Sequence, residues 1–301
     1  MPAMSASMPI IVHHMAALDG QAAVPNSLEA IRACLEAHAP VIEIDVTALA
    51  DSDYLLVHDP TLDTGTTGTG EIGKTTKAQA QTLYFKKNGA ATDYRVPLLS
   101  EVVALFQQYD TPTRLQIDFK NMIPLGTDEL LLRLLTIIEP LQKRMLVSTG
   151  ADWQLRKLRR LAPWLDLGFD IGFYLDFREP SPHPLIFPHQ QGAYGYLDEH
   201  PIAMTKFWST ADYLADRCGA FVGLVPNISV FYINYKLLIQ SLDDGFNWAD
   251  ALHAAGIMLD AYTLDVGNSI AESSVPRLIE AGVDFLTTNT PQALTALVSH
   301  L

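Results

Sequence analysis

Short apolar, β-branched runs alternate with longer segments of helical period along most of this 301-residue chain. This alternation favours parallel strands joined by crossover helices. Eight such runs are expected to be strands and a ninth is a further candidate, so one must be peripheral if a barrel closes at eight. The nine runs are Pro9 to Val12, Val41 to Asp45, Tyr54 to Val57, Leu115 to Phe119, Met145 to Ser148, Leu167 to Phe169, Phe221 to Val225, Ile257 to Tyr262 and Phe285 to Thr287.

The segments between these runs have the periodicity of helices. They are Ser27 to Ala37, Leu99 to Gln108, Asp128 to Leu141, Asp152 to Leu161, Ala203 to Arg217, Tyr235 to Gly245, Ser269 to Ala281 and Pro291 to Ser299. Asn26 precedes the first of them, and its side chain can cap free backbone N–H groups there. The pattern predicts an α/β fold, a (β/α)8 TIM barrel that forms a single domain over residues 1–301.

Two stretches interrupt this alternation. Residues 61–97 are rich in Thr and Gly and predict an insertion after the third strand. Residues 176–201 combine prolines with aromatic residues and predict a long loop after the sixth strand. Loops at the C-terminal ends of barrel strands are where barrel enzymes form their pockets.

Charge and the N-terminal residues narrow the range of partners. The formal net charge is -14 and no run of five basic residues occurs, so nucleic acid is not an expected partner. The first residues lack a basic region and a long apolar run, which predicts neither a signal peptide nor stable membrane anchoring. Cys34 and Cys218 lie far apart in helical segments and are expected to be buried small hydrophobes, so a cytoplasmic location is expected.

Carboxylates within apolar strands are the first candidate functional residues. Glu43 and Asp45 stand two apart and therefore share one strand face. Asp118 lies late in another strand, with Lys120 two residues on. If the three carboxylates converge at one rim, they form an oxygen-only site suited to Mg2+ or Ca2+. Ion pairs with Lys120 or with arginines are the equally weighted alternative.

Histidines at strand ends supply the second set of candidates. His13 and His14 end the first strand, and His58 ends the third. Any one of them is more often a structural residue. Together with a cation and Lys120, however, two histidines complete the set that phosphodiester cleavage requires, namely charge stabilisation, a base and an acid.

The order and spacing of motifs from Ile11 to Leu105 resemble the glycerophosphodiester phosphodiesterase family. The shared motifs are a histidine after the first strand, Val24-Pro25-Asn26-Ser27-Leu28 at a helix start, IEIDV, VHDPTLD, TGTGEIG and VPLLSEVVALF. LQIDFK, Val147-Ser148-Thr149 and AGVDFLTTNTP extend the similarity over most of the chain. The stretch from Asp176 to Pro201 lies outside it.

This resemblance implies metal-dependent hydrolysis of a small-molecule glycerophosphodiester to glycerol 3-phosphate and an alcohol. It implies that the metal ligands are Glu43, Asp45 and Asp118, that the acid and base are His13 and His58, and that Lys120 and His14 contact phosphate. It leaves open the alcohol, the choice between Mg2+ and Ca2+, which histidine is the acid, and the oligomeric state.

Several positions depart from the family pattern. The usual His-Arg-Gly reads His13-His14-Met15, so either His14 replaces the phosphate-binding arginine or the register is shifted and His14 is catalytic. We favour His13, because it directly follows the apolar strand. The other departures are Pro25 for Glu, Asp118 for the commoner Glu, Tyr262 for Trp and Asn289 for Asp.

Three alternative functions remain. The Asp-x-Lys pattern also resembles the sphingomyelinase D-like phospholipases, which are secreted and disulfide-bonded. A lysophospholipase D-like activity is a second possibility, with the aromatic-rich region from Asp176 to Trp208 covering an acyl chain. A non-catalytic phosphodiester-binding barrel is the third, suggested by the altered positions His14, Met15 and Asn289.

Overall fold

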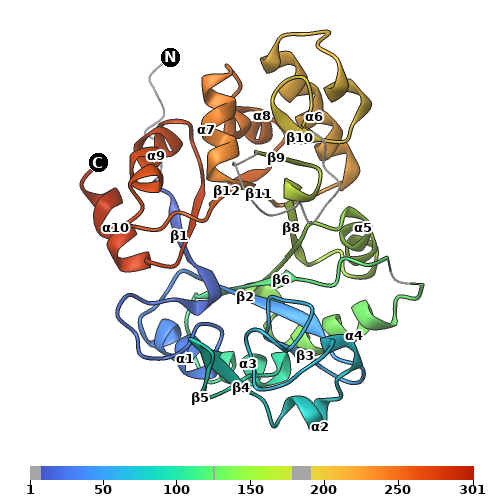
Figure 1. The fold of residues 1–301 in the computed structure, drawn as a ribbon, viewed down its shortest axis with the longest axis vertical. Coiled ribbons are helices and arrows are strands. Elements are labelled where there is room, and N and C mark those ends of the chain that lie inside the picture. The colour runs from blue at the N-terminus through green and yellow to red at the C-terminus, as the bar shows by residue number, and fades with distance from the viewer. Residues whose placement is uncertain (1–7, 125, 178–190) are drawn as a thin grey trace.

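A closed barrel of eight parallel strands forms the centre of the molecule (Figure 1). The computed structural model describes residues 8–124, 126–177 and 191–301. The barrel closes because the first strand pairs with both the last strand and the second. In barrel order the strands are β1 (Ile10–His13), β2 (Val41–Ala48), β6 (Arg114–Phe119), β7 (Met145–Thr149), β8 (Asp166–Asp170), β11 (Val230–Asn234), β12 (Met258–Tyr262) and β13 (Phe285–Thr288). The predicted α/β barrel is confirmed.

Helices surround the barrel and bury its outer face. They are α1 (Leu28–Glu36), α3 (Leu99–Phe106), α4 (Glu129–Ile138), α5 (Asp152–Leu161), α6 (Thr210–Leu224), α7 (Tyr235–Asp243), α8 (Trp248–Ala254), α9 (Ser269–Glu280) and α10 (Pro291–Ser299). Short 3-10 helices are η1 (His14–Ala16), η3 (Glu139–Arg144), η4 (Ile171–Phe173) and η5 (Pro201–Met204).

The start of α1 corrects one sequence prediction. Ser27, not Asn26, caps this helix, because its hydroxyl accepts the backbone N–H of Ala30 at 3.1 Å. Asn26 has a φ of 63° and directs its side-chain amide toward Asp45 instead. The predicted cap is therefore wrong by one residue.

Two strand predictions also need correction. The run from Phe221 to Val225 is not a strand; it continues the helical face on which Leu214, Cys218 and Phe221 are buried. The predicted helix from Ala203 to Arg217 is accordingly replaced by η5 and then α6. The barrel strand in this region is β11, which sequence reasoning missed, as it missed α8. A short apolar run fits a strand and a buried helix turn equally well, and only packing decides between them.

The peripheral strand is β3 (Tyr54–Leu55), which pairs antiparallel with the end of β2 outside the barrel. Because β3 is not a barrel strand, each later barrel strand up to β8 comes one place earlier than predicted. The insertion over residues 61–97 follows the second barrel strand rather than the third, and the excursion after β8 follows the fifth rather than the sixth. In that excursion, β9 (Leu175–Phe177) pairs with β10 (Tyr196–Asp198), while residues 178–190 lie outside the described part of the chain.

The insertion has its own secondary structure and apolar cluster. It contains η2 (Ile72–Lys74), α2 (Lys77–Ala80) and the antiparallel pair β4 (Tyr84–Lys87) and β5 (Ala90–Arg95). Leu62, Ile72 and Phe85 from the insertion pack with Leu55 and Val57. Figure 1 shows β4, β5 and α2 beside β3 and α3, so this unit borders one side of the barrel.

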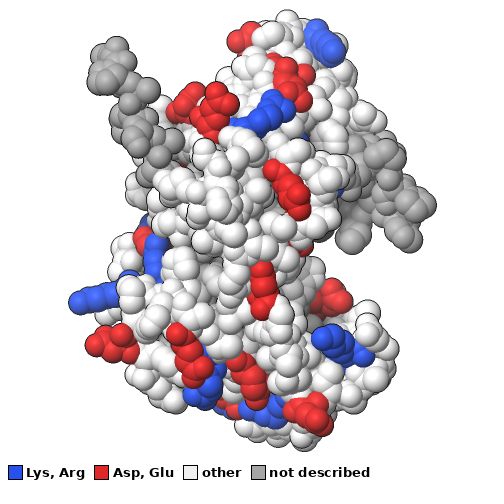
Figure 2. All heavy atoms as spheres, turned by 90° about the vertical axis from the view of Figure 1, so that its left-hand side faces the viewer, with Lys and Arg blue, Asp and Glu red and all other residues white. Residues whose placement is uncertain are grey.

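The surface and the helix lengths bear on possible partners. On the face shown in Figure 2, basic side chains are scattered among acidic ones and form no continuous basic patch. Among the described residues, no helix combines the length and the apolar character needed to cross a bilayer. Cys34 and Cys218 are free and buried, as predicted.

The barrel interior contains one carboxyl group below the functional end. Asp260 is 1% exposed, and its oxygens accept hydrogen bonds from the Thr287 hydroxyl at 2.9 Å. Burial raises the pKa of Asp260 from its usual 3.8 to about 7. The folded protein therefore binds this proton more tightly than the unfolded chain does.

We predict that this group lowers the free energy of unfolding as pH rises from about 4 to about 7, by at most on the order of 4 kcal/mol. The stability is present at the acidic end of this window and is lost as the carboxyl ionises. Asp260→Asn should remove that part of the pH dependence. Urea unfolding of both proteins at pH 5 and pH 8 measures it; identical pH dependence in the two would contradict the prediction.

Candidate active site

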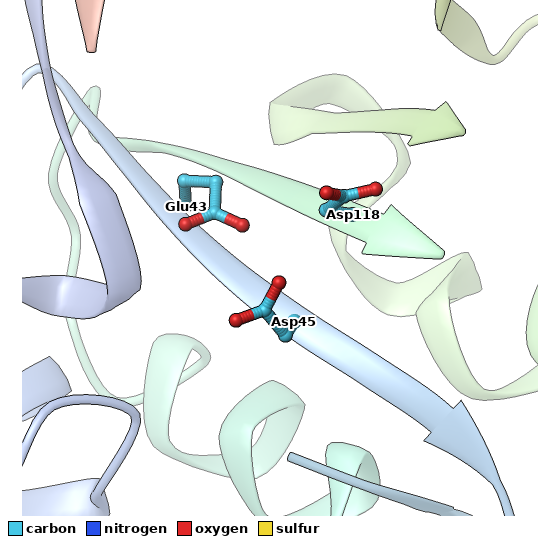
Figure 3. Close-up of side chains that lie close together, drawn as sticks. All are labelled: Glu43, Asp45 and Asp118. Atoms are coloured by element: carbon cyan, nitrogen blue, oxygen red, sulfur yellow. The ribbon is translucent and has the colours of Figure 1, made fainter. Parts of the chain in front are cut away.

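Three carboxylates meet at the C-terminal end of the barrel (Figure 3). Glu43 and Asp45 point inward from β2, while Ile42, Ile44 and Val46 pack outward against the helices. The register pairs Asp45 directly with Asp118 on β6. Each residue offers an oxygen, and the three oxygens lie within 4.8 Å of one another.

Lys120 is the cation within this cluster. Its Nζ lies 3.0 Å from Asp45 Oδ1 and 2.6 Å from Asp118 Oδ2. Burial opposes the charge on Lys120, but the carboxylates of Asp118 and Asp45 outweigh burial and raise the pKa of its ammonium group. The three carboxylates converge as predicted, and the alternative prediction of ion pairs also holds, because Lys120 pairs with two of them.

Glu43 shows that one ammonium group does not balance the cluster. Its pKa is raised well above the usual range by burial and by repulsion from Asp45 and Asp118. The Met15 N–H, 2.7 Å from Glu43 Oε2, and the charge of Lys120 offset this only in part. A divalent cation would relieve the repulsion, and oxygen-only donors are those that Mg2+ and Ca2+ prefer. The residues present thus fit such an ion, which the cluster could hold.

The two adjacent histidines, at the end of β1 and the start of η1, point to different sides of the barrel wall. His13 faces outward toward α1, where its Nδ1 lies 2.9 Å from the Ala17 carbonyl and 3.7 Å from Cys34 Sγ. Burial lowers the pKa of His13. His14 instead lines the cavity above the carboxylates. The geometry therefore favours His14 as the histidine that can reach a substrate, whereas the sequence analysis favoured His13.

A chain of hydrogen bonds fixes the orientation of His14. Asp265 accepts the Asn289 backbone N–H at 2.7 Å and its side-chain amide at 2.9 Å. The amide oxygen of Asn289 then faces His14 Nδ1 at 2.8 Å, so Nδ1 donates. His14 Nε2 is left facing the site, 3.9 Å from Glu43 Oε2. A separation of 275 residues hid this contact from sequence reasoning.

His58 enters the same cavity from the other side. It follows β3, its side chain is 60% exposed, and its Nδ1 lies 3.1 Å from Asp59 Oδ1. The cavity has a volume of about 320 Å³. Its lining combines the predicted His14, Glu43, His58, Asp118 and Lys120 with Gln116, Ser148, Asp170, Tyr232, Tyr262, Thr263 and Thr287.

Asp170 is a carboxyl group of the cavity lining that the sequence analysis did not identify. It ends β8, and burial raises its pKa to about 6. The Tyr262 hydroxyl and the Gly172 N–H donate to its Oδ1 at 2.9 and 2.8 Å. Its place at the C-terminal end of a barrel strand is the signal that could have identified it.

The barrel and this acidic, histidine-lined cavity define a TIM-barrel enzyme of the hydrolase class with a site that could hold a metal ion. The chain belongs to the glycerophosphoryl diester phosphodiesterase family, whose sequence model matches residues 5–293. That membership makes it a phosphoric diester hydrolase and confirms the resemblance noted from its motifs.

Individual relatives agree with this assignment. A glycerophosphodiester phosphodiesterase of Caldanaerobacter subterraneus subsp. tengcongensis is 24% identical over 275 residues, covering 91% of each chain. The crystal structure of a glycerophosphodiester phosphodiesterase from Parabacteroides distasonis has a TM-score of 0.68 at 16% identity, covering 97% of this chain and 98% of that one. An Oleispira antarctica phosphodiesterase, solved with the product sn-glycerol-3-phosphate, has a TM-score of 0.60 at 18% identity and 97% coverage of both chains. The two structural similarities show the shared fold.

Removing the Lys120 ammonium tests the balance of charge in the cluster. With chelator present, Lys120→Gln should lower the free energy of unfolding at pH 8 by about 3 kcal/mol, because buried carboxylates lose their partner. The loss should shrink toward pH 5 as the carboxyl group of Glu43, whose pKa is raised, takes up a proton. Urea unfolding at both pH values measures it. Lys74→Gln, which breaks an exposed pair with Glu71, is the control and should cost below about 1 kcal/mol at either pH.

Proposed function

We propose that this protein hydrolyses glycerophosphodiesters to glycerol 3-phosphate and an alcohol, with a divalent cation held by Glu43, Asp45 and Asp118. The observation that carries the proposal is the shared cavity, which is lined by Glu43, Asp118, Lys120 and two histidines, with Asp45 close to the other two carboxylates. The complex of the Oleispira phosphodiesterase with its product, sn-glycerol-3-phosphate, supports glycerol 3-phosphate as a product here. Mg2+ and Ca2+ both fit an oxygen-only donor set.

A cation bound by the carboxylates, together with Lys120, would stabilise the negative charge that develops on the phosphoryl group. A bound cation would withdraw negative charge from the nonbridging oxygens, which is the main task in phosphoryl transfer. Lys120 would contact the same oxygens from the side of Asp118. Because Lys120 is held by two carboxylates, it needs little reorganisation when substrate binds.

His14 and His58 would transfer the protons. His14 presents Nε2 to the cavity because Nδ1 donates to Asn289, so it is arranged to accept a proton from the attacking nucleophile. His58 approaches from the open side and would protonate the leaving alkoxide. His13, which packs against α1, would support the strand end rather than the chemistry.

The remaining expectations concern partners and location. The cavity volume of about 320 Å³ suits a small-molecule diester. The net charge of -14 disfavours nucleic acid as a substrate. A cytoplasmic location and the absence of membrane anchoring stay predictions from the sequence.

Release of glycerol 3-phosphate from glycerophosphocholine and glycerophosphoethanolamine tests the activity directly. His14→Ala and His58→Ala should each lower kcat by about 10²- to 10⁴-fold, since each removes a proton-transfer group. His13→Ala is the matched control and should keep kcat within about tenfold of the wild type. A larger loss in His13→Ala than in His14→Ala would restore His13 as the catalytic histidine.

Metal binding can be measured without turnover. Adding Mg2+ or Ca2+ to chelator-treated protein should raise Tm, because an ion bound only to the folded state contributes about 2.7 kcal/mol at a hundredfold excess over Kd. Asp45→Asn and Asp118→Asn should reduce this shift. Asp216→Asn, which alters an exposed carboxylate on α6, should leave it intact. A shift of equal size in all four proteins would argue against the acidic cluster as the site.

A further inference from the structure

A second cavity adjoins the active site and shares His58 with it. Its volume is about 260 Å³, and it lies between the barrel mouth and the insertion. Unlike the first, it is lined mainly by apolar side chains. These are Met15, Val24, Pro25, Leu56, Val57 and Phe85.

The insertion builds one wall of this apolar cavity. Val57 and Phe85 belong to the insertion's buried cluster, and Val24 packs against the same cluster. Phe85 lies at an irregularity in the pairing of β4 with β5, between Tyr84 and Lys86. Such bulges redirect a side chain near active sites. Phe85 is therefore the buried residue by which the insertion contributes to this wall, beside Val57 from the segment that precedes the insertion.

Met15 forms the opposite wall in an unfavourable backbone conformation. Its φ is 51° and its ψ is 33°, in the left-handed region that favours glycine. A non-glycine residue held there costs on the order of 1 kcal/mol or more, and such outliers cluster at ligand sites. A glycine would keep the N–H that donates to Glu43, so this contact does not require a side chain. The methionine side chain itself contributes apolar lining.

The charged groups at the rim of the apolar cavity already have partners. Asp59 Oδ1 lies 3.1 Å from His58 Nδ1, and Lys86 Nζ donates to the Asp63 carbonyl at 3.2 Å. Both groups are partly exposed to solvent, so the apolar walls, rather than these charges, set the chemistry of the occupant. Because His58 borders both cavities, an occupant continuous with a phosphodiester would enter from the leaving-group side.

We propose that the apolar cavity binds the alcohol portion of the substrate, and that this portion is an uncharged alkyl chain rather than choline or ethanolamine. Met15 and Phe85 select that chain. The inference rests on the proposed function, which it deepens by naming the substrate class. It also places the chain-binding surface beside the insertion rather than beside the region from Asp176 to Trp208.

Binding of methyl, butyl and hexyl phosphate to the Mg2+-supplied protein, followed by calorimetry, tests the cavity without turnover. Each added methylene should lower Kd about two- to fourfold in the wild type. The gain should flatten in Met15→Ala and in Met15→Gly, the second of which suits the positive φ and so guards against misfolding. Val24→Lys, which places a charge at the partly exposed cavity edge, should flatten it as well.

Met204→Ala truncates an exposed methionine outside both cavities and should keep the wild-type dependence on chain length. Hydrolysis of the methyl, hexyl and choline diesters of glycerol 3-phosphate completes the test, with the hexyl diester expected to have the highest kcat/KM. A Kd independent of chain length, or a dependence that survives in all cavity variants, would overturn the inference even if the methyl diester is hydrolysed. Tight, Met15-dependent hexyl binding without turnover of any diester would instead sustain the cavity and refute the proposed phosphodiesterase activity.

Discussion

Three carboxylates and one lysine share the buried C-terminal end of the barrel, and their mutual electrostatics govern this end of the molecule. Asp45 and Asp118 stand side by side across two strands and share Lys120. Glu43, two residues before Asp45 on β2, is repelled by Asp45 and Asp118, and the N–H of Met15 offsets this repulsion only in part. Such a group is tolerated because the barrel holds its backbone rigidly and the outward faces of the same strands bury apolar side chains. This uncompensated negative charge is also what would favour binding of a divalent cation by the three carboxylates.

Successive side chains along a strand point to opposite faces, so neighbouring residues contact different parts of the molecule. This alternation brings Glu43 and Asp45 to one face, and it separates His13 from His14 although they are adjacent. His13 becomes part of the packing between β1 and α1, whereas His14 reaches the cavity and is oriented by Asn289. The same alternation explains why a strand-end motif can be recognised in the sequence, whereas the sequence alone does not show which of its two histidines reaches the cavity.

The insertion contributes to a second, apolar cavity at this end of the barrel. The cavity over the carboxylates is polar, whereas the neighbouring cavity is lined mainly by apolar residues, among them Met15 and Phe85 of the insertion. His58 lies on the boundary between them. A polar cavity beside an apolar one would suit an amphipathic diester, the substrate class that we propose. The fold supplies the first, and the loop between β2 and α3 supplies the second.

Periodicity and spacing in the sequence determined the barrel, seven of its eight strands, the convergence of the acids and the family, because these depend on local alternation and on residue types at fixed intervals. Tertiary structure decided the rest. Phe221 to Val225 became helix because packing, not composition, chooses between a strand and a buried turn. The choice of His14, the Asn289 contact and the apolar cavity depend on groups far apart in the chain, whose proximity exists only after the barrel closes and the insertion folds against it.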